Sequence, residues 1–131
     1  KSFDTLKNLK VLILGISYRA NVKEIAFSGA IDLKNILVNS GAKVFAIDPF
    51  YTKSEINEIG FEYEEDLSKE FDAVILHTNH REFSEIDFKK FSKGTKLLDG
   101  RNFYSKEKVP SDIDFFKFGN LFIFKMVVSF Q

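Results

Sequence analysis

Two arginines carry the first chemical signal in this 131-residue sequence. Arg19 and Arg101 lie in polar segments that each follow a short apolar run, and Tyr18 stands beside the first of them. The planar guanidinium group binds a phosphate or a carboxylate through two parallel hydrogen bonds. If the two segments meet at one edge of the fold, they form a local anion site that suits a diphosphate. The alternative is that both arginines are solvated or pair with Glu24 and Asp99.

The two histidines, His77 and His80, lie three residues apart in a predicted loop. As a metal pair they lack a third ligand at a recognisable spacing, so we expect no metal site. His80 could donate a hydrogen bond to a ligand oxygen or act as an acid or base. The simpler interpretation is that both histidines cap backbone groups of the loop.

The turn after the first apolar run was compared with the glycine-rich fingerprint of dinucleotide-binding proteins, G-x-G-x-x-G. It reads Gly15-Ile16-Ser17-Tyr18-Arg19-Ala20, so only the first of the three glycines is present. Asp48 ends the second apolar run, where an acid could hold a ribose, but Asp48-Pro49 also reads as a strand stop and a turn. The sequence therefore favours a strand stop and a turn at this place over a self-contained NAD site.

Composition excludes several classes of function. Nineteen basic and nineteen acidic residues give a net charge of zero, which argues against a broad surface for nucleic acid. The absence of cysteine excludes a disulfide scaffold, a thiolate zinc site and a cysteine nucleophile. The chain starts at Lys1 without a methionine or a signal stretch, so we expect a piece excised from a larger cytoplasmic protein.

The polar segments require a scaffold that brings them together. The order of apolar runs and helical spacings predicts an α/β protein, a Rossmann-like three-layer sandwich with a mostly parallel sheet of five or six strands. Strands are expected at residues 9–14, 43–47, 61–63, 73–76, 96–98 and 113–118. Helices or helical turns are expected at residues 31–40, 53–58, 66–70 and 85–91, with Ser28 as the cap of the first. Ligands of such sheets bind at the carboxyl ends of the strands where the strand order reverses.

The end of the chain differs from the rest. We divide the sequence into a binding domain at residues 1–119 and an apolar tail at residues 120–131. The apolar stretch of the tail is about half of the ~20 residues that a membrane-spanning helix needs, and Lys125 interrupts it. We therefore expect an edge strand or a segment that docks on a partner, and no membrane span.

These segments also carry a family resemblance, which runs from about Leu9 to Asn102. The matching pieces are the run 10–19, then Asn21, 28–33, 41–44, Asp48-Pro49, 80–83 and 99–102. In this order and spacing they resemble the C-terminal, UDP-binding domain of the UDP-glucose/GDP-mannose dehydrogenase family.

The resemblance implies a function. Family members oxidise the C6 alcohol of a UDP- or GDP-sugar to the carboxylate with NAD, through a thiohemiacetal on a cysteine. NAD is held by an N-terminal domain and the cysteine by a central domain, so this chain would bind the UDP-sugar and be inactive alone. The resemblance also implies a homodimer and a role in polysaccharide biosynthesis. The residues expected to bind substrate are Tyr18, Arg19, His80, Arg101 and Asn102.

The sequence departs from the family pattern at several positions. The usual Arg-Glu-Ser-Pro before the first helix is Ala26-Phe27-Ser28-Gly29, which removes an arginine that resembles an NAD contact. Lys23-Glu24 replaces acidic residues and hints at a branch that acts on N-acetylated hexosamines. Two alternatives stay open: a free-standing α/β nucleotide-binding or regulatory module without catalysis, and an interaction domain that dimerises through its apolar tail.

Overall fold

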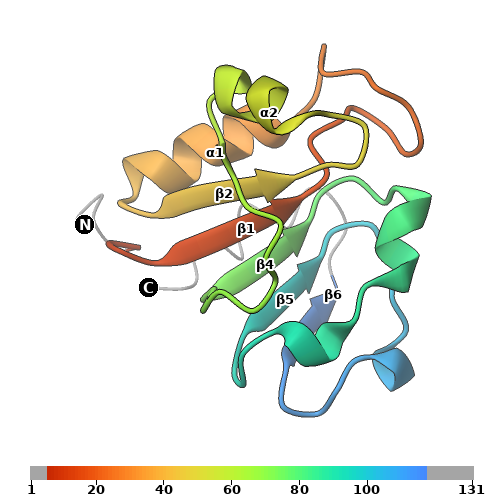
Figure 1. Cartoon of the computed structure of the whole chain (residues 1–131). Helices are drawn as coiled ribbons and strands as arrows, with labels where there is room; N and C mark the ends of the chain where they lie inside the picture. Colours follow the sequence, from red (N-terminus) through yellow and green to blue (C-terminus); the bar gives the residue numbers. More distant parts are fainter. Residues whose placement is uncertain (1–5, 118–131) are drawn as a thin grey trace.

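The computed structural model describes residues 6–117, which form a single parallel sheet with helices and short 3₁₀ segments around it (Figure 1). In chain order the elements are β1 (Lys10–Leu14), α1 (Ala30–Asn39), β2 (Lys43–Ile47), α2 (Lys53–Ile59), β3 (Glu62–Tyr63), β4 (Ala73–Leu76), η1 (Arg81–Glu85), η2 (Phe88–Lys90), β5 (Lys96–Asp99), η3 (Lys106–Lys108) and β6 (Asp114–Lys117). The predicted tail at 120–131 lies outside the described residues.

The sheet has the order β3-β2-β1-β4-β5-β6, and each strand pair within residues 6–117 is parallel. The chain runs outward from β1 to β3, crosses back, and continues outward from β4 to β6. The strand order therefore reverses between β1 and β4, as in doubly wound nucleotide-binding folds. This confirms the predicted α/β Rossmann-like class, with six strands.

Each central strand is buried on both faces. Successive side chains of a strand point to opposite sides of the sheet, so each strand contributes to a core on either side. In β1, Val11 and Ile13 belong to one hydrophobic cluster, while Leu12 and Leu14 belong to the other. The same alternation repeats in β4. Continuous apolar runs of four or five residues are thus explained by two cores rather than one.

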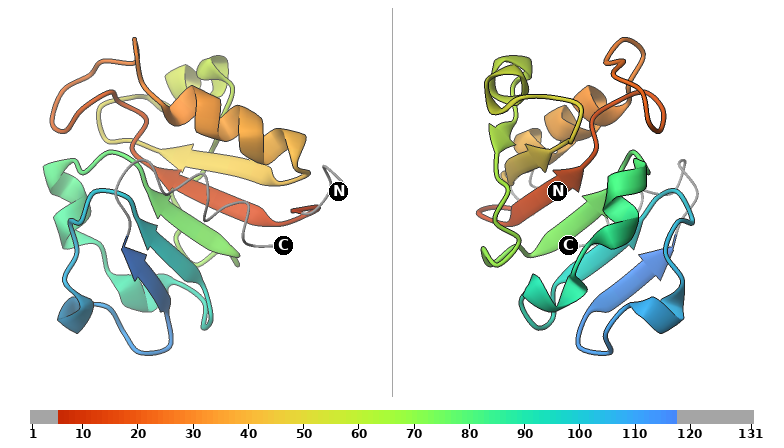
Figure 2. Two further views of the ribbon diagram at one scale, coloured as in Figure 1. Left: turned by 180° about the vertical axis from the view of Figure 1, so that it is seen from behind. Right: turned by 45° about the vertical axis from the view of Figure 1, so that its right-hand side comes forward.

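The two cores are covered differently. Leu33 and Leu37 of α1 and Ile56 of α2 close the first face, and α1 lies over it in the view from behind (Figure 2). The second face is closed by the 3₁₀ segments, which carry Phe83 and Phe88 into the core. The third layer of the predicted sandwich therefore consists of short turns with large aromatic side chains instead of long helices.

Three local predictions need correction. The helix expected at 85–91 is two 3₁₀ segments, because Ile86 is extended and the Asp87 carboxylate accepts the Lys89 N–H and starts a new turn. The segment 66–70 forms a turn and no helix. Helix α1 begins one residue later than a Ser28 cap would place it, with Gly29 as N-cap, but Ser28 Oγ still accepts the Ala30 N–H at 3.1 Å.

The strand ends are in register at the carboxyl edge of the sheet. Leu14 pairs with Ile47 on one side and with Leu76 on the other, and Leu76 pairs with Asp99. The loops that follow β1, β2, β4 and β5 therefore leave the sheet at one level, on the right in Figure 1. These loops contain the predicted site residues.

Candidate functional site

The loop after β1 starts with a turn that only glycine can make. Gly15 has a φ of +85°, and a Cβ atom there would lie 2.5 Å from Thr78 Cβ and 2.6 Å from Thr78 O. Its N–H donates to Ile47 O at 2.9 Å. The close approach lets the chain cross the end of β4 and brings the loops after β1 and β4 into contact.

Asp48 holds this junction together from the end of β2. The carboxylate is 1% exposed; its Oδ2 accepts the Ile16 N–H at 2.8 Å and lies 2.9 Å from His80 Nε2, and its Oδ1 accepts the Phe50 N–H at 2.8 Å. Both oxygens are directed into the fold. The strand-stop interpretation of Asp48 therefore fits, and a ribose contact does not.

His80 is fully buried, and both of its ring nitrogens have partners. Nδ1 accepts the Asn21 N–H at 2.9 Å, so Nε2 carries the proton and donates to Asp48. The Asn21 side chain in turn accepts the Arg81 N–H at 2.7 Å. Direct contact of His80 with a substrate does not agree with this geometry. The imidazole instead fixes the loop after β1 to the loop after β4.

His77 forms a second link between the same loops. Its Nδ1 lies 3.1 Å from Gly15 O, an atom that only accepts, so this nitrogen carries the proton. Thr78 Oγ1 donates to Ser17 O at 2.7 Å. Burial, followed by the charge of Arg101, lowers the pKa of His77 to about 4, so the imidazole is neutral at pH 7. As the simpler interpretation predicted, His77 caps a backbone group of the loop.

The rest of the loop after β1 is turned toward solvent. The Arg19 side chain is 68% exposed, and its Nε lies 3.5 Å from Glu24 Oε1. Tyr18 is 48% exposed and Phe27 is 90% exposed, and their rings meet edge to face with centroids 6.4 Å apart. Arg19 therefore makes the Glu24 pair that was the alternative to an anion site.

The loop after β5 is short and held from within. The Asp99 carboxylate is fully buried and accepts three backbone N–H groups, from Arg101 at 2.9 Å and from Phe103 and Tyr104 at 2.7 Å. The half-buried Arg101 donates from Nε to His77 O at 2.7 Å. Burial lowers the pKa of this guanidinium, which stays charged at neutral pH. Asn102 is exposed, with a φ of +54°.

The structure thus joins three of the predicted loops at the reversal of the strand order. Arg101 contacts the segment after β4 directly, and the segment that carries Tyr18 and Arg19 contacts it through Asn21 and Ser17. The side chains of Tyr18 and Arg19 are exposed, while Arg101 is half-buried.

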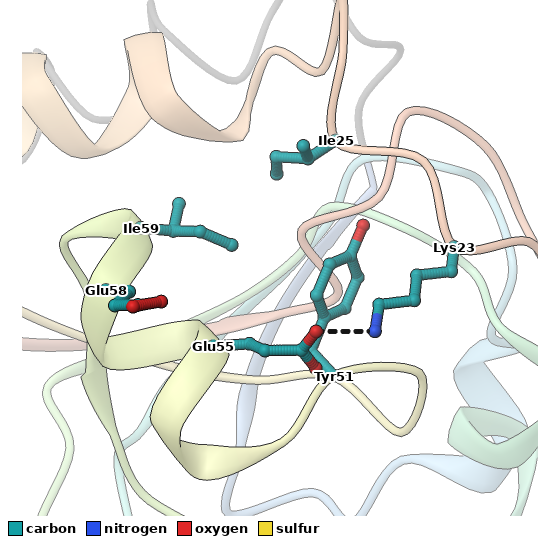
Figure 3. A pocket seen from close by; sticks show the side chains of 6 residues that line it. All are labelled: Lys23, Ile25, Tyr51, Glu55, Glu58 and Ile59. Atoms are coloured by element: carbon teal, nitrogen blue, oxygen red, sulfur yellow. Dashed lines mark hydrogen bonds and ion pairs between the residues drawn. The ribbon is translucent and has the colours of Figure 1, made fainter.

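A surface pocket of about 420 Å³ lies between the loop after β1 and α2 (Figure 3). Lys23 Nζ and Glu55 Oε2 form an ion pair of 2.6 Å across it, and Tyr51 stands at its centre. Burial raises the pKa of Tyr51, whose hydroxyl lies 3.4 Å from Ser17 Oγ. Sequence reasoning missed this pocket. The sequence feature that could have indicated one of its walls is the capping box of Thr52 and Glu55, which fixes Glu55 in the first turn of α2.

Comparison with known proteins agrees with this arrangement. Residues 12–106 match the model of the UDP-glucose/GDP-mannose dehydrogenase family, UDP binding domain. The chain belongs to this family. YtcA of Bacillus subtilis strain 168, a provisionally named UDP-glucose 6-dehydrogenase, is 34% identical over 117 residues, which are 83% of this chain and 27% of YtcA. The UDP-glucose 6-dehydrogenase of Rhizobium meliloti strain 1021 is 29% identical over 111 residues, 79% of this chain and 25% of that protein.

Solved structures show the same fold. The UDP-N-acetyl-mannosamine dehydrogenase Cap5O from Staphylococcus aureus superimposes with a TM-score of 0.67 at 23% identity, covering 98% of this chain and 31% of Cap5O. The UDP-glucose dehydrogenase from Pyrobaculum islandicum gives a TM-score of 0.65 at 23% identity, covering 87% of this chain and 26% of the other. This member of the dehydrogenase family therefore spans about a quarter of the length of the curated relatives it matches.

Members of this family are dehydrogenases, so the fit of a dinucleotide to this chain was tested. Ser17 and Ala20 occupy the second and third glycine positions of a dinucleotide turn, Tyr18 and Arg19 lie between them, and the Asp48 carboxylate is engaged within the fold. The turn after β1 does not fit NAD. Within residues 6–117, no three histidines or acids gather as a metal site, and no helix is long and apolar enough to cross a membrane.

Proposed function

We propose that this chain is the UDP-sugar-binding, C-terminal domain of an NAD-dependent nucleotide-sugar dehydrogenase. The whole enzyme would oxidise the C6 alcohol of a UDP-hexose or a UDP-N-acetylhexosamine to the uronate. The family match over residues 12–106 includes all the residues expected to bind substrate. The observation that carries the proposal is the half-buried guanidinium of Arg101, held against His77 O at the strand-order reversal.

The geometry suggests a division of work among these residues. Arg101 binds the diphosphate, because its guanidinium is fixed before the ligand arrives. Arg19 adds a second positive charge when it leaves Glu24, and Tyr18 covers a ring or a sugar face. Asn102 extends the polar surface beside Arg101. His80 acts indirectly, by fixing the loop that carries Tyr18 and Arg19.

The remaining parts of the enzyme would supply the redox chemistry. The sequence holds no cysteine, so no thiohemiacetal can form on this chain. We propose that an N-terminal domain binds NAD, that a central domain supplies the cysteine, and that the enzyme is a cytoplasmic homodimer in polysaccharide biosynthesis. In this scheme residues 1–119 bind the nucleotide-sugar and the tail at 120–131 docks on a partner.

Titration of the 131-residue chain with UDP tests the binding role. Replacing Arg101 by Gln removes a charge-assisted contact, so we expect about tenfold or greater loss of UDP affinity by calorimetry or NMR. The matched control is Lys43→Gln, which removes one positive charge at the opposite edge of the sheet and should leave the affinity unchanged. A parent chain that shows no response to millimolar UDP would overturn the proposal.

The native reading frame tests the enzymatic role separately. We expect it to extend upstream and to encode a glycine-rich dinucleotide turn and a cysteine in the central region. A frame that begins near Lys1 would instead identify a free-standing binding or regulatory module.

A further inference from the structure

Phe27 combines two features that rarely occur together. It has a φ of +65°, in the left-handed region that disfavours residues with large side chains, and its side chain is 90% exposed. The flanking residues hold it there. The Ser28 N–H donates to Ile25 O at 3.0 Å, and Ser28 Oγ donates to Ile16 O at 2.7 Å. The ring is therefore presented on a fixed backbone.

The strained conformation brings no burial within residues 6–117. The ring contact recorded for Phe27 is the edge-to-face contact with Tyr18, at 6.4 Å between centroids and 70° between planes. The backbone of Tyr18 is held as well, because its N–H donates to Glu24 O at 2.6 Å. Two exposed rings thus lie at 70° to each other on the loop after β1, and Arg19 follows Tyr18 directly in the chain.

This combination fits a particular class of ligand. Aromatic side chains bind nucleotide bases by stacking, and guanidinium groups bind the attached phosphates. A purely apolar partner would gain nothing from Arg19 and Arg101, and a purely anionic ligand would gain nothing from two exposed rings. Both rings lie within residues 12–106, which match a UDP binding domain.

We propose that Phe27 and Tyr18 form an aromatic seat for the planar base of a nucleoside diphosphate whose phosphates are bound by the arginines. This inference rests on the proposed function and adds a residue to it. The base belongs either to the UDP-sugar or to an adenine nucleotide, and stacking serves both.

The experiment compares ligands with and without a base. UDP, ADP and inorganic pyrophosphate are titrated into the 131-residue chain and its Phe27→Ala variant. We expect Phe27→Ala to weaken binding of the base-bearing ligand about tenfold and to leave pyrophosphate binding within about twofold. Loss confined to UDP assigns the seat to the UDP-sugar, loss confined to ADP assigns it to an adenine nucleotide, and loss of both indicates stacking without base readout.

Variants at the same position separate binding from folding. Phe27→Tyr keeps a ring and should restore most of the affinity, while Phe27→Asn suits the left-handed backbone and should give a Tm no lower than the parent's. Val38→Ala is the matched control, since it trims another exposed apolar side chain away from the loop. It should leave UDP affinity unchanged.

Two results would contradict the aromatic seat without contradicting the proposed function. One is a parent that binds UDP and ADP with affinities that Phe27→Ala alters for neither ligand. The other is a Phe27→Ala variant that binds UDP normally but loses self-association in light scattering, which would make Phe27 a protein contact. If the parent binds neither UDP nor pyrophosphate, the proposed function itself fails.

Discussion

The two loops that carry the arginines hold these side chains in different ways. After β5, Arg101 follows a buried carboxylate by two residues, and its guanidinium is held on His77 O at 2.7 Å. After β1, the chain runs from Gly15 to Gly29 before α1 starts, and Arg19 is 68% exposed with one ion pair of 3.5 Å. One cation is fixed by the fold, and the other lies at the rim.

The difference indicates what each loop contributes to binding. A preorganised donor loses little conformational entropy when a ligand arrives, whereas a mobile arginine loses most of its rotamer freedom. The loop after β5 should therefore provide most of the affinity for phosphate. The loop after β1, with its exposed rings at Tyr18 and Phe27, should decide which nucleotide is accepted.

The largest expected effect is on the fixed loop. Replacing Asp99 by Ala leaves three backbone N–H groups, those of Arg101, Phe103 and Tyr104, without their acceptor. We expect the free energy of unfolding to fall by about 4 kcal/mol, measured by urea denaturation. Asp114→Ala is the control, because this exposed carboxylate makes a long ion pair of 3.4 Å with Lys96, and its loss should cost less than about 1 kcal/mol. Equal losses for the two variants would contradict the contrast between buried and exposed carboxylates.

The second effect concerns the neutral histidine that links the loops. The pKa of His77 is about 4 in the fold and about 6.5 unfolded, because burial and Arg101 disfavour the imidazolium more than Asp48 and Gly15 O favour it. Between these values the unfolded chain binds more protons than the folded one. Stability from His77 is therefore complete above about pH 6.5 and is lost as the pH falls toward 4, by up to about 3 kcal/mol.

The measurement is the difference in the free energy of unfolding between the parent and a His77→Gln variant. Taking this difference cancels the contributions of the other titrating groups. Urea denaturation from pH 7 to pH 4 should show the parent losing more stability than the variant. Parallel curves for the two proteins would mean that folding does not lower the pKa of His77.

Much of the scaffold was predictable because it depends on local patterns. The apolar runs at 43–47 and 73–76 coincide with β2 and β4, and the strand ends located the polar loops correctly. Both runs are bounded by polar or turn-forming residues, and each is too short for a helix. The alternation of strands and helices predicted a mostly parallel sheet, but the order of its strands comes from the structure.

The orientation of polar side chains was not predictable from local patterns. His80 and Asp48 are separated by 32 residues, and their hydrogen bond exists only because β2 and β4 flank β1 in the folded sheet. His80 in the sequence is a ligand candidate, whereas in the fold it is buried. Likewise nothing in the letters around Phe27 indicates a left-handed backbone, which arises from the anchoring of Ser28 on Ile16 O.

The smallest expected effect comes from replacing each of the two arginines by lysine. These substitutions keep both positive charges and therefore compare the geometry of the two side chains. Arg101→Lys loses the Nε donor and the planar group that sits on His77 O, so UDP affinity should fall about tenfold. Arg19→Lys keeps the charge at an exposed position whose pair with Glu24 is long, so affinity should change by less than about threefold. Calorimetric titration of both variants with UDP at one fixed salt concentration measures the ratio. A larger loss for Arg19→Lys than for Arg101→Lys would reverse the assignment, because it would show that the exposed guanidinium, and not the fixed one, makes the bidentate phosphate contact.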